Sequence, residues 1–116
     1  MDSNKRACLA LIIGRAENQN YKSVYDFGTG KICLFTSSGG VENIHVFDFQ
    51  RNCIVNGSLA SFYDMGTNSF TTINKNGSSF RGFDYGTTSF FTGSINGNVV
   101  MTYDCQDLSY NTYSLI

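Results

Sequence analysis

The sequence predicts an all-β domain, in which a short N-terminal apolar helix or strand precedes an antiparallel meander of about ten strands. Three observations indicate this fold class. A phrase built on Asp and aromatic residues recurs five times, turn-forming residues separate the copies, and the composition is rich in aromatic, Gly and small polar residues. The 116 residues contain no Pro and no linker. We therefore expect one domain, with residues 1–18 as the N-terminal element and 19–116 as five hairpin repeats of about 20 residues.

The repeated phrase places an Asp between an aromatic residue and an apolar one, with a second apolar residue six positions after the Asp. The Asp residues of the five copies are Asp26, Asp48, Asp64, Asp84 and Asp104, separated by steps of 22, 16, 20 and 20 residues. Eleven of the seventeen aromatic residues fall into the three apolar columns of this phrase. The match therefore reflects an internal repeat rather than composition alone.

A tight β-hairpin explains the spacing within each copy. With a two-residue turn after the apolar residue, the aromatic residue before each Asp faces the residue six positions after it. The predicted pairs are Tyr25 with Ile32, Phe47 with Ile54, Tyr63 with Phe70, Phe83 with Phe90, and Tyr103 with Tyr110. Each Asp faces the residue five positions later, which gives Asp26 with Lys31, Asp64 with Ser69, Asp84 with Ser89, and Asp104 with Ser109. Since side chains alternate across a strand, we expect the aromatic columns and Cys105 to form the buried face and the Asp residues the polar one.

The turns predict the remaining connections. Gly28-Thr29, Gly66-Thr67 and Gly86-Thr87 place Gly first, as a type II′ turn requires. Gln50-Arg51 and Gln106-Asp107 do not fit that turn, so longer or different loops are expected there. Between the copies, turns are predicted at Ser37-Ser38-Gly39-Gly40, Asn56-Gly57, Asn76-Gly77 and Asn96-Gly97. The expected strands are 21–27, 31–37, 42–49, 52–56, 59–65, 68–74, 79–85, 88–94, 98–104 and 108–115.

The N-terminal element contains the longest apolar run of the chain, ACLALII at residues 7–13. Cys8, Leu9, Ile12, Ile13 and Ala16 share one helical face, and Asp2 or Ser3 could cap it, which favours a short helix over residues 4–16. A buried first strand is the alternative. The run is far shorter than the roughly 20 residues that span a bilayer, and no cleavage site for a signal peptide follows it. The sequence predicts no membrane partner and a cytoplasmic location, with secretion as the alternative.

Ten strands with one apolar face must hide that face. An up-and-down barrel or rolled sheet is favoured, with a two-sheet sandwich and a hairpin solenoid as alternatives. Strands of about seven residues are shorter than outer-membrane strands, so a membrane barrel ranks last. The interior of a closed barrel would be filled by side chains, by the N-terminal segment or by a small apolar ligand. The many aromatic residues favour a self-filled interior.

Composition excludes several classes of function. The net charge is −1, and Lys and Arg cluster only at Lys5-Arg6, so nucleic acid is not expected as a partner. Cys8, Cys33, Cys53 and Cys105 form no CxxC pair, and His45 is the only histidine, which argues against a zinc site and favours reduced, packed cysteines. We predict no metal residues and no cofactor.

Several short motifs have plain structural interpretations. Asp26-Phe27-Gly28 and the following Gly28-Thr29-Gly30-Lys31 resemble a kinase metal-binding tripeptide and the end of a phosphate loop, but a strand rather than a helix follows them. The five Asp residues could form a ring of calcium ligands, but we expect them to accept hydrogen bonds from their own turns. The sequons at Asn56 and Asn76 are interpreted as turns.

The sequence does not assign a function. The best hypothesis is a small non-catalytic β binding or scaffold protein that acts through protein or small-molecule contacts, with no catalytic residue and no binding residue assigned. Candidate partners are a second copy of the chain, pairing through the uncharged last strand at 108–115, another protein, and a small apolar ligand. The alternatives are a small hydrolase that combines a repeat Asp with His45, and a carbohydrate-binding module that uses the outer face and loops.

Overall fold

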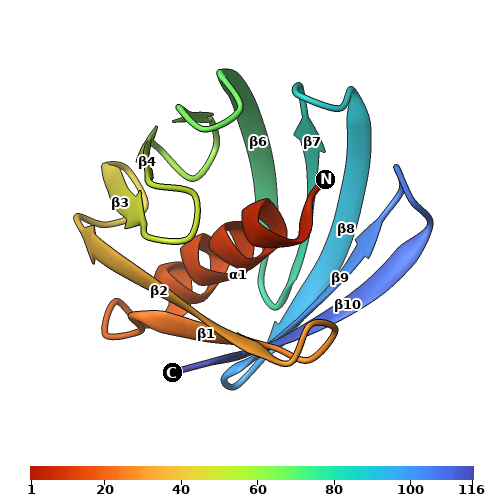
Figure 1. Cartoon of the computed structure of the whole chain (residues 1–116), viewed down its shortest axis with the longest axis horizontal. Coiled ribbons are helices and arrows are strands. Elements are labelled where there is room, and N and C mark those ends of the chain that lie inside the picture. The colour runs from red at the N-terminus through yellow and green to blue at the C-terminus, as the bar shows by residue number, and fades with distance from the viewer.

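The computed structural model describes residues 1–116 and confirms the all-β prediction (Figure 1). Ten antiparallel strands form a closed barrel around one helix. The strands are β1 (Ser23–Asp26), β2 (Lys31–Ser38), β3 (Ile44–Asp48), β4 (Cys53–Gly57), β5 (Phe62–Asp64), β6 (Ser69–Asn76), β7 (Ser79–Asp84), β8 (Ser89–Asn96), β9 (Val99–Asp104) and β10 (Ser109–Leu115). Consecutive strands pair throughout, and β10 pairs with β1, so the up-and-down barrel has no free edge.

Helix α1 (Ser3–Glu17) runs through the barrel (Figure 1). Asp2 caps it by accepting hydrogen bonds from the backbone N–H groups of Asn4 (2.8 Å) and Lys5 (3.2 Å). Residues 7–14 are all buried, which means that the helix is covered on every side. A helix that is apolar all round belongs in a core, so the N-terminal segment fills the barrel. The helix lacks the length and apolarity needed to cross a membrane.

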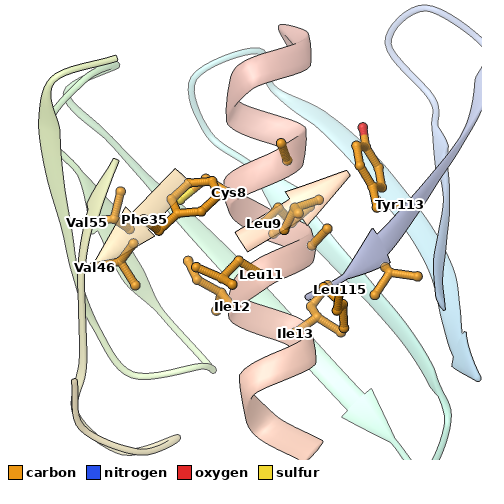
Figure 2. Close-up of a cluster of buried hydrophobic side chains, with 14 of the residues drawn as sticks. Cys8, Leu9, Leu11, Ile12, Ile13, Phe35, Val46, Val55, Tyr113 and Leu115 are labelled. Carbon is orange, nitrogen blue, oxygen red and sulfur yellow. The ribbon is translucent and has the colours of Figure 1, made fainter. Parts of the chain in front are cut away.

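The side chains of α1 contact opposite walls of the barrel (Figure 2). Cys8 lies beside Phe35, while Leu9 lies on the side of Tyr113. A Cβ atom on Gly14 would come within 2.3 Å of Leu115, so the missing side chain lets β10 approach the helix closely. A cavity of about 10 Å³ remains between the end of α1 and β2–β3, room for roughly one water molecule.

The predicted hairpin register is confirmed in all five copies. Tyr25 pairs with Ile32, Phe47 with Ile54, Tyr63 with Phe70, Phe83 with Phe90, and Tyr103 with Tyr110. Each repeat Asp likewise lies opposite the residue five positions later. The spacing in the sequence therefore determines which residues are neighbours across each hairpin.

The predicted assignment of the two faces is wrong. All five repeat Asp residues point into the barrel and are at most 3% exposed, whereas Phe90 is 64% and Tyr110 81% exposed. Cys105, predicted to be in the core, is exposed. The inward face is apolar farther from the turns, at positions such as Val24 and Val46, which lie two residues before an Asp. The repeated phrase covers only the turn end of each hairpin, where charged groups from α1 and Arg51 meet the inward-facing Asp residues.

The predicted turn type is also wrong. Each hairpin closes with a four-residue turn, and its left-handed residue is the fourth after the Asp rather than the second. These residues are Gly30 (φ 71°), Asn52 (53°), Asn68 (51°), Thr88 (51°) and Leu108 (56°). The two turns that begin with Gln therefore belong to the same class as the other three, contrary to expectation. The Asp carboxylate accepts a hydrogen bond from the N–H of the second residue after it. This local turn does not require a positive φ at the second residue, so Gln fits there as well as Gly.

Leu108 carries a strain that glycine would relieve, because a side chain in the left-handed region costs roughly 1 kcal/mol. Leu108 is 73% exposed, so removing its side chain loses little packing. We expect Leu108→Gly to raise the free energy of unfolding by about 0.5–1 kcal/mol in urea denaturation. Leu108→Ala keeps the Cβ and is expected to give no such gain. Equal effects of the two substitutions would contradict the strain argument.

The connections between hairpins follow the predicted turns at Asn76-Gly77 and Asn96-Gly97 but not at the other two places. Ser37 and Ser38 belong to β2, and Asn56 and Gly57 belong to β4 and pair with β5, so both of these links begin later in the chain than predicted. Gly77 (φ 60°) and Gly97 (φ 61°) close the links from β6 to β7 and from β8 to β9. The strand predicted at 59–65 shrinks to β5, because Ser58 and Ser61 form a turn through reciprocal backbone hydrogen bonds of 3.0 and 3.1 Å. The last strand, β10, is paired on both sides, so the edge expected to support a homodimer is not free.

Candidate functional site

The carboxylates of the five repeat Asp residues lie inside the barrel, at the end where the Asp-containing turns close the hairpins. In every copy, Oδ1 of the Asp accepts a hydrogen bond of 2.8–3.1 Å from the N–H two residues later. In two copies the next N–H also donates, from Thr29 and Arg51, both at 3.3 Å. The prediction that these Asp residues bind their own turns is confirmed. Each carboxylate thus anchors a turn from inside the barrel.

The first turns of α1 bring positive charge to two of these carboxylates. Lys5 Nζ lies 2.7 Å from Asp84 Oδ1, and both side chains are almost fully buried. Arg6 Nη1 lies 3.0 Å from Asp104 Oδ2, and the amino group of Met1 lies 3.2 Å from the same oxygen. Because a buried charge requires a partner, these pairs fix the depth of the helix in the barrel.

Arg51, in the turn between β3 and β4, forms ion pairs with two further repeat carboxylates. Its Nε and Nη1 atoms each lie 2.8 Å from a carboxylate oxygen, of Asp48 and Asp64 respectively. Burial alone would lower the pKa of Arg51, but the hydrogen bonds and charges of these carboxylates raise it above its ordinary value. Asp26 alone among the repeat Asp residues has no ion pair.

The arrangement at the turn end is therefore structural. Four of the five carboxylates are neutralised by cations of the chain itself, and no three His, Cys, Asp or Glu side chains are grouped so as to hold a metal ion. Sequence reasoning missed these cation partners. Asp2 marks the start of α1, so the sequence does place Lys5 and Arg6 in its first turns. The sequence does not give the orientation of the helix inside the barrel, and this orientation determines which Asp residue Lys5 and Arg6 each contact.

His45 is separated from the repeat carboxylates by the barrel wall. It lies exposed on β3, between Ser38 and Asn56 of the neighbouring strands. Asp48 lies on the same strand but is fully buried inside the barrel. The structure thus does not bring together the residues of the hypothetical hydrolase.

The four cysteines are free, and their environments differ widely. Cys8 and Cys33 are buried, Cys53 is half-buried and Cys105 is exposed. Burial raises the pKa of the Cys8, Cys33 and Cys53 thiols above the ordinary value, because a thiolate is poorly solvated inside the protein. The expected packing holds for Cys8 and Cys33, and it fails for Cys105.

Exposed aromatic residues occur on the outside of every hairpin from β5 to β10, and we call the outside of β4 to β10 the outer wall; its most exposed rings on strands are those of Phe70, Phe90 and Tyr110. Within hairpins, the rings of Phe83 and Phe90 lie 4.8 Å apart, and those of Tyr103 and Tyr110 lie 4.6 Å apart. Neighbouring hairpins are joined by a hydrogen bond from the Tyr85 N–H to the Phe70 carbonyl (3.1 Å). Each of these hairpins therefore carries aromatic side chains on its outer face, and the hairpins are neighbours in the sheet.

Farther from the Asp-containing turns, the outer wall is polar but nearly uncharged. On β6, β8 and β10 the outward positions there carry Thr72, Asn74, Asn76, Thr92, Ser94, Asn96, Thr112 and Ser114, whereas β9 carries the apolar Val99 and Met101. Arg81 is the only charged residue at an outward position of β4 to β10. Two open hollows of about 630 and 300 Å³ adjoin it, and both are lined by Arg81 and Asn74.

A further open hollow of about 580 Å³ lies at the end of the barrel opposite the Asp-containing turns. It is bordered by Leu59, Ala60 and Ile73, where β5 stops short of the full length of β6. Lys75 lies at its rim and forms an ion pair with Glu17 at the end of α1.

Comparison with protein-family models, with curated proteins and with solved structures finds no match to this chain. The candidate site is therefore identified from its geometry alone. The outer wall combines exposed aromatic rings, small polar side chains and one unpaired guanidinium on a rigid sheet.

Proposed function

We propose that the protein is a small non-catalytic binding protein that contacts another protein through the outer wall. The observation that supports this proposal is the exposure of aromatic side chains on a nearly uncharged sheet, with Phe90 64% and Tyr110 81% exposed. Large exposed apolar patches on a folded protein typically mark interaction sites. Aromatic rings supply contact area at low entropic cost, and Ser, Thr and Asn supply adaptable hydrogen bonds.

The filled interior favours the outer wall over a small apolar ligand inside the barrel. Helix α1 occupies the core, and the cavity beside it measures only about 10 Å³. Sites for drug-sized ligands usually enclose about 300–1,000 Å³ and bury most of the ligand. The hollows beside Arg81 are large enough but open to solvent, which suits a protein surface better than an enclosed ligand.

Site-specific photocrosslinking tests this proposal in cells that naturally make the protein. A benzoylphenylalanine at Tyr110 places the crosslinker on the outer wall, and the control places it at Leu34, which also faces outward but lies on β2. We expect a discrete crosslinked protein from the Tyr110 position and not from Leu34. The identified partner, once purified, should lose about tenfold or more in affinity with Phe90→Ser. The same products at both positions, or none at either, would contradict the proposal.

A carbohydrate is the second candidate ligand. The hollow of about 300 Å³ places Thr72, Asn74 and Arg81 next to the rings of Phe83 and Phe90. Amide and hydroxyl groups beside an aromatic ring provide the hydrogen bonds and stacking that a sugar needs. Saturable binding of an oligosaccharide on a glycan array, abolished by Phe90→Ser, would favour this candidate over a protein partner.

A further inference from the structure

The position of Arg81 on the outer wall indicates the chemistry of the partner. The side chain is exposed on β7, with the neutral residues Asn74 and Thr92 opposite it on β6 and β8. No hydrogen bond or ion pair within the chain engages its guanidinium, whereas Arg6, Arg15 and Arg51 all bind groups of the chain. Arg81 thus presents a full set of donors on a surface that otherwise carries no charge.

The neighbourhood of Arg81 is suited to a carboxylate beside an apolar group. Phe83 follows two residues later on the same face of β7, and its ring packs against Phe90 at 4.8 Å. A guanidinium binds a carboxylate through two parallel hydrogen bonds, and the amide of Asn74 can donate a third. Arg and aromatic residues are also the side chains that most often dominate binding energy in protein interfaces.

We propose that the partner protein presents a segment in which an Asp or Glu lies next to an apolar side chain. The carboxylate binds Arg81, and the apolar side chain packs on Phe83 and Phe90. This inference rests on the proposed function and specifies its partner. A second copy of the chain fits this site poorly, because the outer wall contains no carboxylate at any outward strand position to face Arg81.

Selection from a displayed library of random linear peptides tests the inference directly. The targets are the wild-type protein, Arg81→Gln, Arg81→Glu and Phe90→Ser, each first shown to unfold at the wild-type temperature. We expect peptides selected on the wild type to be enriched in Asp or Glu beside aromatic or aliphatic residues. Their affinity should fall about tenfold on Arg81→Gln, and selection on Arg81→Glu should favour Lys and Arg instead.

Three outcomes would overturn the inference, and they differ in their consequences. Peptides without acidic enrichment that still depend on Phe90 would refute the role of Arg81 and leave the outer wall as the binding surface. Peptides that depend on neither residue would refute both the inference and the proposed function. Binding of an acidic oligosaccharide that requires Arg81, with no peptide selected, would assign the site to carbohydrate.

Discussion

Replacing Arg51 with Met is expected to lower the free energy of unfolding by about 3–5 kcal/mol, because it leaves two buried carboxylates without their cation. Asp48 and Asp64 are 0% and 1% exposed, and each has an oxygen 2.8 Å from the Arg51 guanidinium. Small domains are stable by only about 5–15 kcal/mol, so the variant should be close to unfolding at room temperature. Urea denaturation followed by far-UV circular dichroism measures the loss.

Two variants serve as controls for Arg51→Met. Arg81→Met removes an exposed guanidinium without an ion pair and should change stability by at most about 0.5 kcal/mol. Adding Asp48→Asn and Asp64→Asn to Arg51→Met removes the uncompensated charges and should restore a large part of the lost stability. A loss below about 1 kcal/mol for Arg51→Met, or no recovery in the triple variant, would refute the view that this arginine neutralises the interior.

Replacing Leu11 with Ala is expected to cost about 2–5 kcal/mol, because Leu11 lies at the centre of the helix that fills the barrel. The side chain is 0% exposed and sits among residues of both barrel walls (Figure 2). Closely packed walls cannot collapse far into the space that the substitution leaves. Thermal denaturation and urea denaturation both report the loss.

Leu34 is the matched control for Leu11. It is 55% exposed on the outside of β2, so Leu34→Ala should cost less than about 1 kcal/mol. Similar costs for the two substitutions would mean that α1 does not lie inside a closed barrel.

The periodic part of the sequence predicted the fold well, because hairpins are local structures. The spacing between Tyr63 and Phe70, or between Phe83 and Phe90, determines register without any knowledge of distant residues. The apolar face and a cap at Asp2 or Ser3 likewise favoured the helix over a buried strand from neighbouring residues alone, and Asp2 is the cap.

The choice of the buried face could not be made from the repeated phrase. Near the turns, aromatic residues alternate with Asp, and a simple pattern of apolar inside and polar outside assigns the aromatic residues to the core. The protein reverses this because Lys5, Arg6 and Arg51 reach the Asp residues from inside the barrel. The candidate site was missed for the same reason, since a surface assigned to the core cannot be proposed as an interface.

Thiol labelling in the native state tests this reversed arrangement most directly. The intact protein is treated with iodoacetamide at pH 8, and labelled cysteines are identified by mass spectrometry over time. Cys105 lies in an apolar column of the repeat and is exposed, so it should react first and at nearly the rate of a free thiol. Cys8 and Cys33 are buried in the core and should react only as the protein unfolds, although all cysteines should react in urea. Protection of Cys105 together with fast native labelling of Cys33, which shares the inward face with Asp26, would show that the aromatic columns face inward after all.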